Sequence, residues 1–168
     1  MWPLPLLAAL TLASAAGEVR LPVPYVAQEK NGCGAAVLAM VMRYWGAAGV
    51  DAAAMHRDLY VPAAHGVYAS AMQAYLQTHG FRAFAFSGGW DDLRQHLGKG
   101  RPLIVALKTR GGALHYVVLA GVSDDGVLRQ DPAVPGYGKQ SRREFESEWK
   151  GTGNWTLLAL PSSSAAAP

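Results

Sequence analysis

Cysteine is almost absent from this sequence, and charge of either sign is scarce. A single cysteine, Cys33, occurs in 168 residues, which excludes an intramolecular disulfide and any metal site built from several cysteines. Charged residues make up 16% of the chain, and the 15 Lys and Arg exceed the 12 Asp and Glu by only three. So small and scattered an excess argues against a nucleic-acid partner. If Cys33 has a chemical role, it therefore acts as a free thiol.

Long hydrophobic runs and nucleotide-binding motifs are also missing. No apolar run reaches the about 20 residues that span a bilayer, and no G-x-x-x-x-G-K-[ST] sequence occurs. Residues 1–16 combine a short apolar run with Ala13-Ser14-Ala15, a small-residue pattern typical of signal-peptide cleavage, although they carry no charged side chain. We predict a secretory signal peptide over residues 1–16 and an exported protein, periplasmic or extracellular. The alternative is an uncleaved interfacial anchor.

The segment between the two ends has the composition of one folded domain. Apolar residues make up 51% of the chain, which is ample for a core. We predict a single domain over residues 20–160. Residues 161–168 are low in complexity, and we predict a disordered tail there.

Helices are expected first along this domain and strands later. Apolar spacing and caps predict helices over residues 33–44, 52–59, 70–79, 90–97 and 141–149. Asp51 is the expected cap of the second helix, and Ser141 with Glu144 forms a capping box for the last. Apolar, β-branched runs predict strands over residues 81–86, 102–107, 115–122, 127–130 and 155–160, with a tight turn at residues 124–126. This order predicts an α+β fold, with N-terminal helices packed on an antiparallel sheet.

Cys33 stands at the start of the first predicted helix. The positive end of a helix lowers the pKa of a nearby thiol, and the thiolate is the nucleophile. Gly32 and Gly34 flank the cysteine, and we interpret them as leaving room for a substrate backbone. The alternative is a small buried hydrophobic residue.

Three further residues complete a possible catalytic set. His115 opens an apolar strand and is the candidate base, whereas His56, His65, His79 and His96 lie in predicted helices or a loop. Asp131 ends the return strand and would orient the imidazole. His115 and Asp131 lie ten and six residues from the turn centre, so a bulge or loop is needed to join them. Gln28, five residues before Cys33, is a candidate oxyanion donor. Each residue alone also fits a structural role: His115 as a histidine at the edge of the core, Asp131 as the first residue of a turn, and Gln28 as a solvated loop residue.

Three stretches together resemble a known family. VPYVAQEKNGCGAAVLAMVMRYWG, HYVVLAGV and DGVLRQDPA resemble the bacteriocin-leader (double-glycine) cysteine peptidases and their stand-alone relatives, which have a papain-like fold. The resemblance covers most of residues 21–135. Where many members have an acidic residue before the cysteine, this sequence has Gly32.

The resemblance implies a cysteine peptidase that acts on a peptide or protein substrate without a cofactor or metal. It implies Cys33 as nucleophile, His115 as general base and acid, Asp131 as the orienting carboxylate and Gln28 as an oxyanion-hole donor. A transporter encoded nearby is the further partner it suggests. Two alternatives remain open, an acyltransferase on the same scaffold and a non-catalytic peptide-binding module. The histidine spacings of 9, 14, 17 and 19 match no close-ligand metal motif.

Overall fold

The computed structural model describes residues 19–162. The predicted signal peptide and most of the predicted tail lie outside these residues. The helices between residues 19 and 162 are α1 (Cys33–Tyr44), α2 (Ala52–Leu59), the short 3₁₀ helix η1 (Pro62–Ala64), α3 (Ala69–Thr78), α4 (Trp90–Gly98) and α5 (Arg142–Lys150). The strands are β1 (Phe81–Ser87), β2 (Leu103–Lys108), β3 (Leu114–Val122), β4 (Gly126–Gln130), β5 (Tyr137–Ser141) and β6 (Trp155–Pro161).

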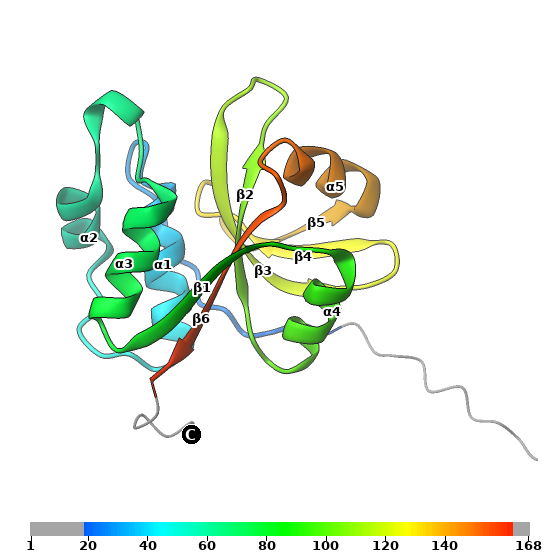
Figure 1. Cartoon of the computed structure of the whole chain (residues 1–168), viewed down its shortest axis with the longest axis horizontal. Helices are drawn as coiled ribbons and strands as arrows, with labels where there is room; N and C mark the ends of the chain where they lie inside the picture. Colours follow the sequence, from blue (N-terminus) through cyan, green and yellow to red (C-terminus); the bar gives the residue numbers. More distant parts are fainter. Residues whose placement is uncertain (1–18, 163–168) are drawn as a thin grey trace, which may run out of the picture.

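The six strands form one sheet in the order β1-β6-β2-β3-β4-β5. Every neighbouring pair is antiparallel, so the predicted α+β fold with an antiparallel sheet is confirmed. In Figure 1 the helices α1, α2 and α3 gather on one side of the molecule, while β3, β4, β5, α4 and α5 lie on the other. The strands β1 and β6 run between these two parts.

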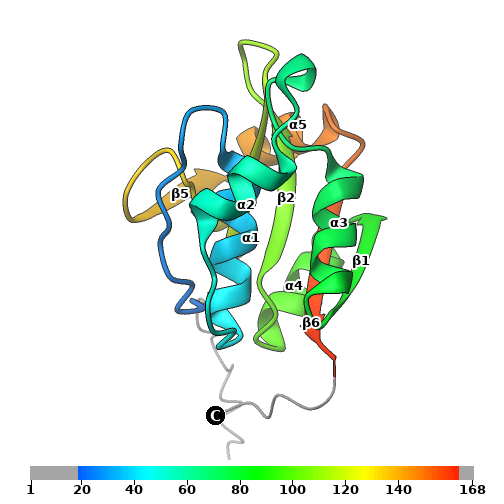
Figure 2. The same cartoon turned by 90° about the vertical axis from the view of Figure 1, so that its left-hand side faces the viewer.

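The first helix is buried almost all round. Nine consecutive residues of α1, from Gly34 to Met42, are buried, and Val37, Leu38, Ala39 and Met40 have no exposed surface. A helix that is apolar on every side belongs inside a protein. The helix packs against α2 and α3 and against β3 and β2, and Figure 2 shows it beside α2 and β2. The start of α1 is therefore held by both parts of the molecule.

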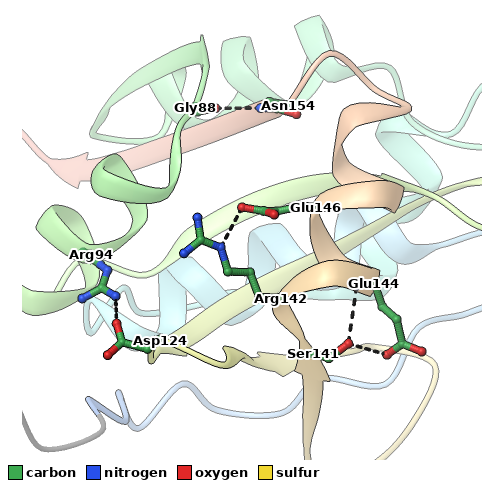
Figure 3. A network of polar contacts seen from close by, with 8 residues as sticks. All are labelled: Gly88, Arg94, Asp124, Ser141, Arg142, Glu144, Glu146 and Asn154. Carbon is green, nitrogen blue, oxygen red and sulfur yellow. Dashed lines mark hydrogen bonds and ion pairs between the residues drawn. The ribbon is translucent and has the colours of Figure 1, made fainter.

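Side-chain caps start two helices where the sequence predicts them. The Asp51 carboxylate accepts two backbone N–H groups in the first turn of α2. The Ser141 hydroxyl accepts the Glu144 backbone N–H at 3.4 Å and donates to the Glu144 carboxylate at 3.0 Å (Figure 3). One turn along, Arg142 Nε donates to Glu146 Oε1 at 2.9 Å, an i,i+4 pair that supports the helix. These contacts begin α2 and α5 at Ala52 and Arg142.

Two elements have no clear signal in the sequence, and the bounds of the predicted helices and strands differ from the observed ones by at most one residue. The edge strand β5 has the sequence YGKQS, which is poor in β-branched residues, and η1 is a single short turn. The predicted disordered tail begins at residue 161, but Pro161 is the last residue of β6. The Ser162 N–H also donates to the Gly80 carbonyl at 2.8 Å. The strand ladder with β1 carries the chain one residue further than its composition suggests.

Candidate active site

Cys33 is the first residue of α1, as the sequence predicts. Its side chain is partly buried, and the His115 ring and the backbone N–H groups of Gly34 and Tyr116 lie close enough to the sulfur to lower its pKa. Gly34 belongs to the helix and Tyr116 to β3. The helix start and the strand thus meet at the sulfur atom.

Other residues of the protein fill the space beside the two glycines that flank Cys33, which corrects the prediction that they leave room for a substrate. A Cβ atom on Gly34 would lie 2.8 Å from Cβ of Val67. A Cβ on Gly32 would lie 3.0 Å from the carbonyl oxygen of Glu29 and 3.3 Å from Nδ1 of His56. Both positions are therefore closed in by the protein itself. A glycine that makes room for the protein's own residues and one that makes room for a ligand look the same in the sequence, so only the structure distinguishes them.

His115 and Asp131 meet in a short hydrogen bond. His115 Nε2 lies 2.7 Å from Asp131 Oδ1, and the two side chains are only 18% and 13% exposed. Asp131 Oδ1 also accepts the Ala133 backbone N–H at 2.9 Å, which fixes the carboxylate. With Nε2 bonded to Asp131, Nδ1 is the ring nitrogen left for Cys33. The structure thus places Cys33, His115 and Asp131 in one chain of contacts.

A bulge in β3 explains how His115 reaches Asp131. Val118 pairs with Gln130, whereas beyond an irregularity between Leu119 and Gly121 the pairing shifts by one residue. Side chains alternate along a strand, so a shift of one residue moves a whole strand segment to the other face. With the bulge, Asp131 follows Gln130 opposite Val117, which shares a face with His115. Without the bulge, Asp131 would oppose Val118 and point away.

The segment before α1 carries Gln28 to the same end of the sheet. The Gln28 backbone N–H donates to the Pro132 carbonyl at 3.0 Å, and the Tyr25 hydroxyl donates to the same carbonyl at 3.2 Å. Among residues 19–162, no hydrogen-bond partner is found for the buried Gln28 Oε1. Gln28 is therefore beside the turn that holds Asp131, while its side chain makes no hydrogen bond to Cys33.

The pKa values within this group shift toward a charged pair. Burial acts to lower the pKa of His115, but hydrogen bonds to Asp131 and Cys33 outweigh it and raise the pKa to about 9. Burial acts to raise the pKa of Cys33, yet the His115 contact and the two backbone N–H groups leave that pKa below its ordinary value. The pKa of Asp131 is also lowered, because the His115 and Ala133 hydrogen bonds and the Arg129 charge outweigh burial. The geometry therefore favours a thiolate beside an imidazolium.

Two contributors to this site were not identified from the sequence. Arg129 lies with its guanidinium Nη2 3.7 Å from Asp131 Oδ2. It precedes Asp131 by two residues on β4, and the alternation of side chains along a strand was the signal that could have found it. Tyr116 acts through its backbone N–H on the Cys33 sulfur, and a backbone contact leaves no trace in residue type.

His56, His79 and His96 take part in local packing. His79 stacks on Tyr75 with ring centroids 3.8 Å apart, and His56 lies against Tyr60.

Within residues 19–162, no group of three His, Cys, Asp or Glu side chains is arranged to hold a metal ion. None of the helices in this range is long and apolar enough to cross a membrane.

A cysteine at the start of a buried helix, facing a histidine and a carboxylate on an antiparallel sheet, is the arrangement of the papain-like cysteine peptidase fold. Residues 20–157 match the Peptidase_C39 like family. The chain belongs to this family, and the resemblance noted from its sequence is confirmed. Comparison with curated proteins finds no significant match.

Solved structures of the same fold cover most of the chain. A protein described as a C39-like peptidase from Bacillus anthracis matches with a TM-score of 0.73 and 19% identity, over 88% of this chain and 99% of that one. The peptidase domain of Streptococcus ComA, a bifunctional ABC transporter of a quorum-sensing pathway, matches with a TM-score of 0.70 and 23% identity, over 83% and 98%. A double glycine motif protease from an AMS/PCAT transporter, solved with its leader peptide, gives 0.65 and 26%, over 86% and 97%.

Proposed function

We propose that this chain is an exported cysteine peptidase in which Cys33 attacks peptide bonds with the help of His115 and Asp131. The observation that carries the proposal is the contact chain from the Cys33 sulfur through the His115 ring to the Asp131 carboxylate. A nucleophile, a base and a group that orients the base are the parts that nucleophilic catalysis requires. The peptidase family of the chain makes peptides the expected substrate class.

In the acylation step, the Cys33 thiolate forms a bond to the carbonyl carbon of the peptide, and the carbonyl oxygen becomes an oxyanion. The Cys33 backbone N–H and the Gln28 side-chain amide are the proposed donors to that oxygen. Collapse of the intermediate breaks the C–N bond. The leaving amine takes a proton from Nδ1 of His115, and a thioester remains on Cys33.

In the deacylation step, the now neutral His115 takes a proton from water. The water oxygen bonds to the thioester carbon, the C–S bond breaks, and the carboxylic acid product leaves while Cys33 returns as thiolate. Asp131 stays ionised and hydrogen-bonded to Nε2 throughout, so the ring keeps the orientation that aims Nδ1 at the sulfur.

Substitution of Cys33 tests the proposal directly. We expect Cys33→Ala to abolish cleavage of a peptide library incubated with the mature protein, with the far-UV circular dichroism spectrum unchanged. Cleavage retained in this variant would remove Cys33 from the mechanism. Product masses measured with and without an added amine distinguish hydrolysis from acyl transfer.

Substitution of His115 tests the thiolate pair. His115→Ala removes both the base and the cation beside the sulfur, so we expect turnover to fall by about 10²- to 10⁴-fold. The rate of iodoacetamide alkylation near neutral pH should also fall, because the pKa of Cys33 rises toward its ordinary value. The protein has one cysteine, so the alkylation rate reports on Cys33 alone. His65→Ala, in the turn after η1, is the matched control and should leave both rates unchanged.

A further inference from the structure

A wide groove lies next to the proposed active site. It has a volume of about 850 Å³, within the range of about 300–1,000 Å³ that holds small ligands. Its walls come from α5, β4 and β5 and from the turn between β2 and β3. The cationic residues that line it are Lys108, Arg110, Arg129, Lys139 and Arg143, and the acidic ones are Glu144 and Glu148.

The residues that line the groove carry more positive than negative formal charge. Its five cations and two carboxylates leave a formal excess of three positive charges, which equals the net charge of the entire chain. The formal charges of all other residues therefore sum to zero. A concave surface lined by one sign of charge concentrates its field and attracts ligands of the opposite sign.

Both carboxylates in the groove accept hydrogen bonds from neutral side chains. Glu148 accepts a hydrogen bond from the neutral Gln140 amide at 2.8 Å, and Glu144 accepts one from the Ser141 hydroxyl (Figure 3). The contact between Arg110 and Glu144 is 3.7 Å long, and the two side chains are 90% and 55% exposed, so this pair is weak. Lys108, Arg110 and Arg143 are exposed and remain accessible to a ligand.

Arg129 connects the groove to the catalytic group. It lines the groove, and its guanidinium is 3.7 Å from Asp131, which in turn bonds to His115. Cys33 and His115 themselves do not line the groove. A chain that occupies the groove therefore passes beside the reacting atoms rather than over them.

We propose that this groove is a subsite for the peptide substrate. It binds acidic side chains of substrate residues that flank the cleaved bond. The proposal rests on the peptidase function proposed above. Exposed ion contacts are individually weak, so several Asp or Glu residues together are needed to give a preference. The positions best placed to provide it are Lys108 and Arg143, which are exposed and have no role in the proposed chemistry.

Binding is measured in the Cys33→Ala background, so that no cleavage disturbs the equilibrium. The probes are two fluorescein-labelled peptides, one with an Asp-Glu-Asp-Glu run and a matched one with Asn-Gln-Asn-Gln. We expect the acidic peptide to bind about tenfold more tightly by fluorescence anisotropy, from several weak ion contacts. The preference should shrink when salt rises from about 0.1 M to about 1 M, because the screening length falls from about 10 Å to about 3 Å.

Substitutions assign the preference to the groove. Lys108→Gln with Arg143→Gln should remove most of it. Arg82→Gln with Lys99→Gln removes the same amount of charge from exposed positions outside the groove and should keep it. Equal binding of the two peptides, or equal loss in both double variants, would overturn the proposal. So would tighter binding of a single-stranded oligonucleotide than of the acidic peptide.

Cleavage by the wild-type protein separates the two proposals. If neither peptide is cleaved but the acidic one still binds preferentially through Lys108 and Arg143, the groove is supported and the peptidase function fails. If both peptides are cleaved at the same kcat/KM and bind equally, the peptidase function stands and the groove proposal fails.

Discussion

Asp131 contributes to the proposed chemistry only through His115. It touches neither the thiol nor a substrate, yet its hydrogen bond to Nε2 decides which ring nitrogen faces Cys33. It also supports the high pKa of His115. The sequence predicts that Asp131 orients His115. The short hydrogen bond between them and the nearby Arg129 depend on the register of β3 and β4 and could not be predicted from sequence alone.

The pH profile of kcat/KM should reflect this arrangement. The active form needs Cys33 ionised and His115 protonated, so activity should rise with pH as the thiol ionises, below its ordinary pKa. Activity should fall again near the pKa of His115, about 9. Asp131→Asn removes the charge that raises this pKa, so the alkaline limb should move to lower pH. An alkaline limb that stays in place in Asp131→Asn would contradict the role given to the carboxylate.

At the scale of elements, the extended segment before α1 works as a strap across the sheet. The Leu21 N–H donates to the Ala120 carbonyl within the bulge of β3 at 2.7 Å, and the buried Gln130 amide donates to the Val23 carbonyl at 2.9 Å. The Tyr137 hydroxyl lies 3.0 and 3.1 Å from the Leu21 and Val23 carbonyls. Nothing in the sequence indicates where this segment docks.

Removal of the Tyr137 hydroxyl tests the strap. Tyr137→Phe deletes a partly buried donor and should lower the free energy of unfolding by about 0.5–1.5 kcal/mol. Backbone amides of residues 19–28 should then exchange faster with deuterium, whereas those of α3 keep their protection. Tyr68→Phe, whose side chain is half exposed, is the control. Unchanged exchange in residues 19–28 would mean that this hydroxyl does not secure the segment.

At the scale of the whole molecule, α1 joins the helical part to the sheet. The helix contacts α2, α3, β2 and β3, so neither part keeps a complete core without it. Apolar spacing predicts the helix over residues 33–44, and the caps Asp51 and Ser141 predict the starts of two others. The edge strand β5 and the β3 bulge escaped prediction, because their formation depends on neighbouring strands rather than on local preference.

A cavity in α1 should therefore weaken both parts together. Leu38→Ala removes a fully buried side chain and should lower the free energy of unfolding by about 2–5 kcal/mol. Urea unfolding followed by far-UV circular dichroism and by tryptophan fluorescence should give coincident single transitions. Separate transitions would show that the helices and the sheet unfold independently.

The bulge in β3 also has a consequence for comparing homologous sequences. His115 and Asp131 are 16 residues apart, but their meeting depends on ladder register and not on that number. Insertions in the turn between β3 and β4 lengthen the spacing without harm. A single-residue insertion or deletion within β3 or β4 turns the Asp131 carboxylate to the other face of the sheet, away from His115, unless the bulge is gained or lost at the same time. Alignments of this family should therefore tolerate variable turn lengths and treat the bulge as part of the catalytic motif.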